Sequence, residues 1–262
     1  MRKKLRDVQS EPDTRNIPIN KVGVKDISYP VVVKDRAEGE QHTVARVNMY
    51  VNLPHNFRGT HMSRFIEILN KYRKGISTLN IRDILNEMKE ELSAETSHFE
   101  IEFPYFITKE APVSREKAKM EYTCRIMGNS DEDFYTMEVR VPVLSLCPCS
   151  KEISRYGGHN QRSILSVTIK AREKIWIETI VEIAESSASS DIYSLLKRED
   201  EKFITERAYE NPVFVEDIVR NAAEKLMKEK SILWFSVESE NFESIHNHSA
   251  YAQIQMSLEP TR

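Results

Sequence analysis

The chain has 262 residues, of which 40% are hydrophobic, enough to bury one large core or two smaller ones. Its 38 basic and 41 acidic residues give a net charge of −3, which excludes a general electrostatic attraction to nucleic acid or to an anionic membrane. There is no apolar run of about 18 residues and no apolar signal-peptide core, so we expect a cytoplasmic protein with no membrane partner.

The N-terminal stretch differs in character from the rest. Residues 1–26 are rich in charge, contain Pro12 and Pro18, and show no sustained apolar period. Such a segment cannot bury enough apolar surface to offset the entropy of ordering it. We therefore predict a flexible or loosely docked arm.

The first half of the chain after the arm changes period twice. Alternation typical of strands gives way to apolar residues three and four positions apart, as in amphipathic helices, and then returns. The prediction is two strands, two helices and two strands, at residues 29–33, 47–53, 62–69, 81–92, 99–103 and 120–126.

The second half repeats this order. Asn211-Pro212 resembles an N-cap and first-turn pair that starts a helix. The predicted strands and helices lie at residues 135–143, 165–169, 177–184, 211–226, 233–237 and 250–258.

Two tandem ββααββ units, residues 27–130 and 131–262, are therefore expected. Antiparallel sheets with helices on one face belong to the α+β class rather than to doubly wound folds. No G-x-G-x-x-G or Walker A segment supports a nucleotide-binding Rossmann or P-loop unit.

The stretch Ser145–Ser163, between two predicted strands of the second unit, is the richest in reactive side chains. Cys147 stands where a strand ends, a position suited to a metal ligand or a nucleophile. Cys149 follows two residues later, and this spacing is too short for the C-x-x-C knuckle of a structural zinc site, so we give it a secondary role. His159 follows two glycines and could turn back toward Cys147, although a surface histidine fits equally well. Cys124 lies on the apolar face of a strand and is expected in the core.

Further candidates lie elsewhere in the second unit. Glu243, His246 and His248 fall between the last two strands, where they suit acid–base chemistry, metal ligation or simply a solvated turn. Glu201 lies in a polar interval that also fits a solvated acidic face. Glu216 lies in a first helical turn, where the helix dipole alone favours a carboxylate.

Three segments together suggest a family. The runs LCPCSKEISRYGGHNQRS, ENPVFVEDIVR and ESIHNHSAYAQ resemble GTP cyclohydrolase I of type IB, and the similarity spans nearly the whole chain after the arm. The resemblance implies a tunnelling fold (T-fold), in which ββααββ units surround a central channel. It also implies a homotetramer whose active sites lie between units and draw on more than one chain.

The resemblance also assigns residues to roles. Cys147 and His159 would bind a divalent metal, zinc, manganese or iron, with Glu201 as a third ligand and His246 as a further one. Glu216 would anchor the purine ring by accepting two hydrogen bonds from guanine, which adenine cannot donate.

The remaining assignments concern proton transfer and the triphosphate. Cys147 and His246 are also counted as catalytic, together with Glu243 and His248, which would transfer protons. Lys151, Arg162 and Arg64 would bind the triphosphate.

The implied reaction converts GTP and water to 7,8-dihydroneopterin triphosphate and formate, the first step of folate biosynthesis. Two alternatives stay open. One is a T-fold enzyme that uses Cys147 as a covalent nucleophile on a pterin or deazapurine, and the other is a non-catalytic protein with a structural zinc.

Overall fold

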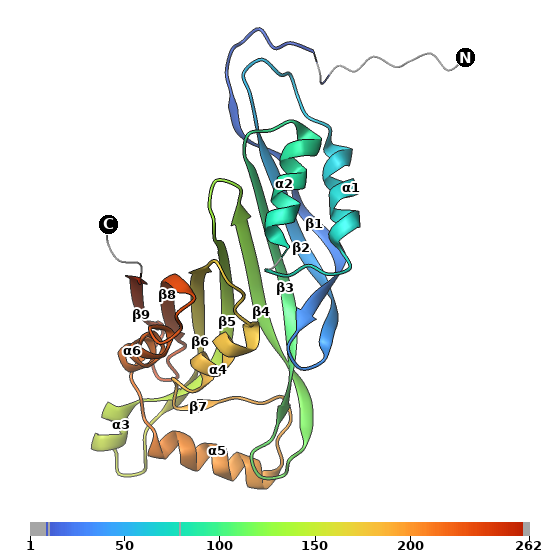
Figure 1. Cartoon of the computed structure of the whole chain (residues 1–262). Coiled ribbons are helices and arrows are strands. Elements are labelled where there is room, and N and C mark those ends of the chain that lie inside the picture. The colour runs from blue at the N-terminus through green and yellow to red at the C-terminus, as the bar shows by residue number, and fades with distance from the viewer. Residues whose placement is uncertain (1–8, 10, 79, 259–262) are drawn as a thin grey trace. The chain divides into compact units, whose positions relative to one another are not determined.

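The computed structural model describes residues 9, 11–78 and 80–258, which form an antiparallel sheet and six helices (Figure 1). Neighbouring strands follow the order β1-β2-β3-β4-β5-β6-β8-β9, and β7 pairs with β5. The strands are β1 (Ile19–Asp35), β2 (Gly39–Leu53), β3 (Ser97–Glu110), β4 (Lys117–Asn129), β5 (Tyr135–Leu146), β6 (Asn160–Ala171), β7 (Ser190–Asp191), β8 (Ile232–Asn241) and β9 (Ala250–Ser257). The helices are α1 (Met62–Tyr72), α2 (Ile81–Leu92), α3 (Pro148–Ile153), α4 (Ile177–Glu185), α5 (Arg198–Glu210) and α6 (Val215–Leu226).

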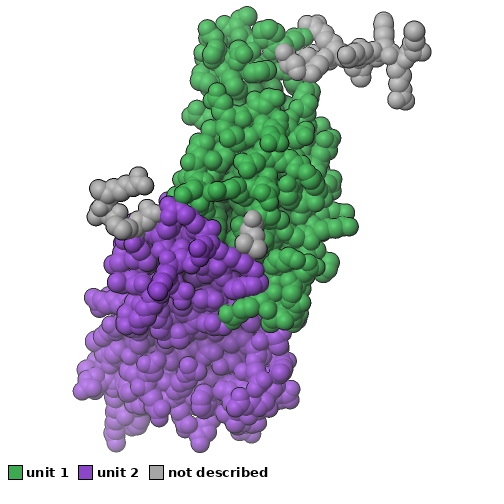
Figure 2. Space-filling view, in the orientation of Figure 1, with its two compact units in different colours: residues 1–103, 125–135 green, residues 104–124, 136–262 purple. Residues whose placement is uncertain are grey.

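The chain divides into two compact units, coloured separately in Figure 2. The first unit consists of Met1–Phe103 and Arg125–Tyr135, and the second of Pro104–Cys124 and Thr136–Arg262. The long strands β3 and β4 each contribute residues to both units, so the units are not continuous in sequence. The expected tandem division at residues 130 and 131 stays a prediction.

In the first unit, α1 and α2 pack against each other, with α1 also contacting β1 and α2 contacting β2 (Figure 1). Apolar residues at helical spacing on the helices meet alternating residues on the strands, as the sequence predicts. Phe65 of α1, Met88 of α2 and Phe99 of β3 are all essentially buried.

The last part of the predicted N-terminal arm is a strand. Residues 1–8 and 10 lie outside the described residues, but residues 19–26, which we assigned to the arm, form the first part of β1. Ile19 lies opposite Leu53 of β2, and the register shifts before Val22 and again before Ile27. Because these irregularities interrupt the two-residue period and most side chains here are exposed, the sequence shows no alternation.

In the second unit, α6 packs against β8, β9 and α4, and α4 contacts β6 (Figure 1). Val167 of β6, Phe235 of β8 and Ile218 of α6 are fully buried in this core. Cys124 is also fully buried, as predicted, and burial raises the pKa of its thiol. No helix in the described part of the chain is long and apolar enough to cross a membrane.

Two boundaries in the second unit differ from the prediction. The stretch Ser145–Ser163 is not a continuous loop, because β5 extends to Leu146, the short helix α3 follows, and β6 begins at Asn160. Asn211 does not start a helix. It is the C-cap of α5, and its side-chain amide donates to the carbonyls of Ala188 and Ser189. The following helix, α6, begins at Val215.

Helix α5 occupies the polar interval between the two predicted helices of the second unit, where no helix was predicted. It is polar on most of its surface, so it lacks the apolar stripe that reveals a helix. Asp200 in its first turn is fully buried and accepts hydrogen bonds from the backbone N–H groups of Lys197, Val113 and Ser114 and from the Ser114 hydroxyl. Burial opposes ionisation, but these hydrogen bonds outweigh it and hold the pKa of Asp200 well below its usual range. Hydrogen bonds to Asp200 thus fix the start of α5.

Candidate active site

Cys147 and His159 lie side by side where β5 ends and β6 begins. The backbone N–H of Cys147 donates to the carbonyl of His159 over 3.0 Å. Cys147 is the N-cap of α3, and its Sγ accepts a hydrogen bond from the Ser150 N–H at 3.4 Å. The Ser150 hydroxyl accepts from the His159 N–H at 3.0 Å, so α3 fixes both residues. Both side chains are half-buried.

Glu243 joins this pair from the segment after β8. Its Oε2 lies 3.8 Å from Nδ1 of His159, and both side chains are largely shielded from solvent. The backbone N–H of Phe242 donates to the carbonyl of Arg162, which ties the segment after β8 to the start of β6. The structure therefore brings together three of the predicted site residues: Cys147, His159 and Glu243.

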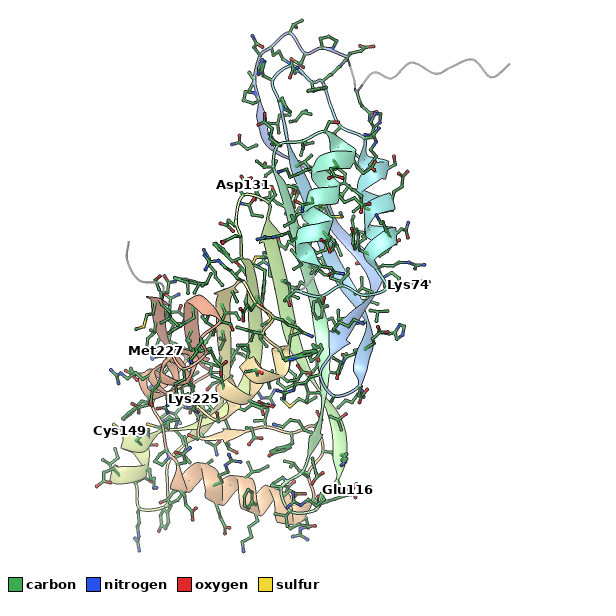
Figure 3. All side chains as sticks on the ribbon, in the orientation of Figure 1. Lys74, Glu116, Asp131, Cys149, Lys225 and Met227 are labelled. Atoms are coloured by element: carbon green, nitrogen blue, oxygen red, sulfur yellow. The ribbon has the colours of Figure 1, made fainter. Side chains whose placement is uncertain are left out.

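A run of small, mostly polar residues, Ser186–Asp191, contacts both the end of β5 and helix α6. We call this run the serine segment. The Ser189 hydroxyl accepts from the Leu146 N–H at 3.0 Å, one residue before Cys147. Lys225 of α6, labelled in Figure 3, donates to the Ser186 carbonyl at 2.6 Å and to the Ser187 hydroxyl at 3.2 Å. The serine segment thus contacts both the strand that ends before Cys147 and the helix that carries Glu216.

Glu216 lies in the first turn of α6, as predicted, and its side chain is exposed. The stretch before this helix also contacts the end of β5, since the Val213 N–H donates to the Leu146 carbonyl at 3.2 Å. Val213, three residues before Glu216, therefore contacts Leu146, the residue that precedes Cys147.

Lys151 has a different environment from the one expected of a free phosphate ligand. Its Nζ donates to the carbonyl of Tyr209 at 2.6 Å and lies 4.4 Å from the centre of the Tyr209 ring. The contact joins α3 to the C-terminal end of α5. Cys149, on the same short helix, is exposed (Figure 3).

Glu201 lies near the opposite end of α5 and is exposed. An α-helix rises about 1.5 Å per residue, so the eight residues from Glu201 to Tyr209 correspond to roughly 12 Å along the axis. The structure thus separates Glu201 from the end of α5 that contacts α3.

The other predicted residues are dispersed. His246 and His248 are exposed after β8, with their rings stacked at a centroid distance of 5.1 Å. Arg162 is exposed on β6. Arg64 belongs to the first unit, where its guanidinium donates to the carbonyl of Glu91. Across residues 9, 11–78 and 80–258, no three His, Cys, Asp or Glu side chains gather closely enough to hold a metal ion.

Sequence reasoning missed the polar residues behind the site. Gln161 is 6% exposed, and its side chain contacts His159 and Ser145. Ser150 and Ser189 were also passed over. One signal was available: Ser145 and Ser163 occupy inward-facing positions of their strands, where most other residues of the same period, such as Val143 on β5 and Leu165 on β6, are apolar.

The fold itself is shared with solved structures of another enzyme. The uricase of Arthrobacter globiformis matches with a TM-score of 0.52 at 9% identity, covering 93% of this chain and 95% of that one. A highly active mutant of the urate oxidase of Bacillus sp. TB-90 matches with a TM-score of 0.53 at 12% identity, covering 91% of this chain and 100% of that one. These similarities identify a tunnelling-fold protein of the α+β class, which confirms the predicted fold class.

Sequence comparison defines the family more narrowly. Residues 5–252 match the family described as type I GTP cyclohydrolase folE2. The GTP cyclohydrolase FolE2 of Geotalea uraniireducens is 62% identical over 252 residues, 96% of this chain and 93% of that protein. The protein of the same name from Geobacter sulfurreducens is 62% identical over 250 residues, 95% and 97% of the two chains. The chain belongs to the type I GTP cyclohydrolase folE2 family, which corresponds to the type IB enzymes that the sequence motifs resemble.

Proposed function

We propose that this protein converts GTP and water to 7,8-dihydroneopterin triphosphate and formate, the first step of folate biosynthesis. The observation that carries the proposal is the 62% identity to a protein named GTP cyclohydrolase FolE2 over 96% of this chain. The side-by-side placement of Cys147 and His159 supports it. Because GTP is an intracellular nucleotide, the proposal includes the cytoplasmic location expected from the sequence.

A divalent metal is part of this proposal, and the residues at the end of β5 fit one. Cys147 and His159 are half-buried, joined by a backbone hydrogen bond and held by α3, and the Nδ1 side of the imidazole is already occupied by protein contacts. This leaves Nε2 as the metal-binding nitrogen. Sulfur, nitrogen and carboxylate donors together accommodate zinc, manganese or iron. When bound, the metal would supply Lewis acidity for hydrolysis at C8 of guanine near neutral pH.

Glu201 completes the proposed ligand set from a second copy of the chain, and His246, in the same segment as Glu243, is a further ligand. Both are exposed in the single chain, and Glu201 lies about 12 Å along α5 from the end that contacts α3. Sites shared between copies require an oligomer, and we propose the homotetramer that the resemblance implies.

Substrate recognition is assigned to Glu216. Its exposed carboxylate on α6 can accept hydrogen bonds from guanine N1–H and the exocyclic amine, a pair of donors that adenine lacks. We assign proton transfer to Glu243, which lies beside His159, and to His246 and His248, whose rings stack in the same segment between β8 and β9. They would exchange protons with the opened purine ring and the ribose.

The triphosphate is assigned to Arg162, Lys151 and Arg64. Arg162 is exposed and available. Lys151 is engaged with Tyr209, so phosphate binding by its ammonium group would require this hydrogen bond to be exchanged. Arg64 would exchange its bond to the Glu91 carbonyl in the same way.

The test is to supply the purified protein with GTP and either Mn²⁺ or Zn²⁺, and to measure formate together with the fluorescence of the oxidised pterin. Stoichiometric formate and pterin are expected, and both should disappear after chelation and return on adding metal. Turnover that survives chelation, with substrate attached to Cys147, would instead establish the covalent mechanism. Unfolding on chelation, without GTP binding, would establish a structural zinc protein.

A further inference from the structure

The inward-facing residues of β5 and β6 change from apolar to polar as the strands reach the site. On β5, Val143 is followed at the next inward position by Ser145, and both are fully buried. On β6, Leu165 is preceded by Ser163 and then Gln161, all buried. Buried polar groups are costly unless they are hydrogen-bonded, so their partners indicate what they contribute.

The partners form a chain of hydrogen bonds that ends on His159. The Ser163 hydroxyl donates to Ser145 Oγ at 3.1 Å, and Gln161 Nε2 donates to the same oxygen at 2.8 Å. This leaves Gln161 Oε1 facing Nδ1 of His159, at 2.9 Å. In this orientation of the Gln161 amide, whose oxygen can only accept, Nδ1 carries the proton and Nε2 keeps its lone pair.

Glu243 acts in the same direction. Its Oε2 lies 3.8 Å from the same nitrogen. A carboxylate there favours an N–H group at Nδ1 and disfavours a lone pair. Two independent acceptors, one amide and one carboxylate, therefore select the same tautomer of the neutral ring.

We propose that Gln161 is a positioning residue that holds His159 in the tautomer with a free Nε2, and that Ser145 and Ser163 hold Gln161 in turn. The inference rests on the proposed metal site, in which Nε2 of His159 is the ligand. Residues that orient a ligating imidazole in this way typically contribute about 10–100-fold to metal affinity.

The first experiment uses metal-free wild-type protein labelled with ¹⁵N-histidine and sedimented for solid-state NMR at about pH 8.5, where imidazole is ordinarily neutral. The His159 signals are assigned by their loss in His159→Gln. We expect a protonated Nδ1 and an unprotonated Nε2. A proton on Nε2 in the wild type would overturn the proposal, and this result does not depend on any Gln161 variant folding.

The second experiment measures Zn²⁺ and Mn²⁺ affinity by competition with a chromophoric chelator. Gln161→Met, which removes the acceptor at similar size, is expected to mix the tautomers and weaken metal binding by about 10–100-fold. Gln161→Glu keeps an acceptor and should retain the wild-type tautomer and most of the affinity. Gln253→Met is the matched control, because Gln253 of β9 bonds only to Ser236 and Glu238 among the contacts described.

The outcomes separate the two proposals. Unchanged metal affinity in folded Gln161→Met, or equal losses in Gln161→Met and Gln161→Glu, would refute the positioning role. If the wild type binds neither metal, the metal site itself is refuted, while the tautomer in the metal-free protein still decides whether Gln161 orients His159.

Discussion

Lys109 is the centre of a buried ionic cluster in the second unit, and replacing it gives a sharp test of how β7 is held. Its Nζ donates to Glu185 Oε1 at 2.8 Å, to Asp191 Oδ2 at 2.8 Å and to the carbonyl of Ile192 at 2.9 Å. The three charged side chains are only 10–15% exposed. Burial raises the pKa of Glu185. Burial also acts to raise that of Asp191, but there the charge and hydrogen bond of Lys109 prevail and lower it.

Lys109→Met removes the charge and keeps most of the length of the side chain. It leaves two carboxylates buried close together without their shared cation. Removing one partner of a buried ion pair typically costs about 3–5 kcal/mol, and we expect a loss of unfolding free energy in this range at about pH 8. Without Lys109, the folded-state pKa of Glu185 rises further, and that of Asp191 rises from its lowered value although Arg207 still donates to it. Because a raised carboxyl pKa penalises the ionised folded protein, the loss should shrink as the pH falls toward about 5.

Urea unfolding followed by tryptophan fluorescence, at both pH values, measures this loss. Lys228→Met is the control, because Lys228 pairs with Glu224 where both side chains are about 70% exposed. Such a surface pair contributes roughly 0–1 kcal/mol. Equal losses in the two variants, or a Lys109→Met loss that grows toward acid pH, would refute the reasoning.

Three further predictions concern the site and its supports. Cys147→Ala should abolish tight Zn²⁺ binding and formate release while the circular dichroism spectrum stays unchanged; a full metal equivalent would contradict the ligand assignment. Glu216→Ala should eliminate measurable GTP binding in calorimetry but preserve metal content, whereas Glu224→Ala on the same helix should bind GTP normally. For Asp200, whose pKa is lowered, the stabilisation should be lost as the pH falls below about 4, so Asp200→Asn should flatten the stability–pH curve there, and parallel curves would argue against it.

The sequence is most informative where one face of an element is buried. Helix α2 begins and ends at the predicted residues, 81 and 92, because its apolar residues lie on a single stripe against the sheet. Helix α5 is hidden because a buried carboxylate, Asp200, fixes its start through partners almost ninety residues away. Asn211 was misread for a related reason: its side chain bonds to Ala188 and Ser189 rather than capping the next helix. Local pattern cannot reveal such distant partners.

The candidate site also combines residues that the local sequence could pair with residues whose positions depend on distant partners. Cys147 and His159 could be paired from the sequence because one short connection carries both. Glu243 could be named only as a reactive side chain, and its position near His159 depends on how β8 pairs with β6. The surroundings of Lys151 could not be predicted, because Tyr209, 58 residues away, provides a carbonyl and a ring for its ammonium group.

The serine segment has a consequence for how this enzyme can vary. Ser186–Asp191 bonds at one end to Lys225 of α6 and at Ser189 to the strand that leads into Cys147. We proposed that Glu216 of α6 anchors the base, so a substitution in α6 chosen to accept a different base should also affect the strand end through Lys225 and this segment. Changes of substrate range by laboratory evolution should accordingly require paired substitutions, one in α6 and one in Ser186–Asp191, with neither tolerated well alone.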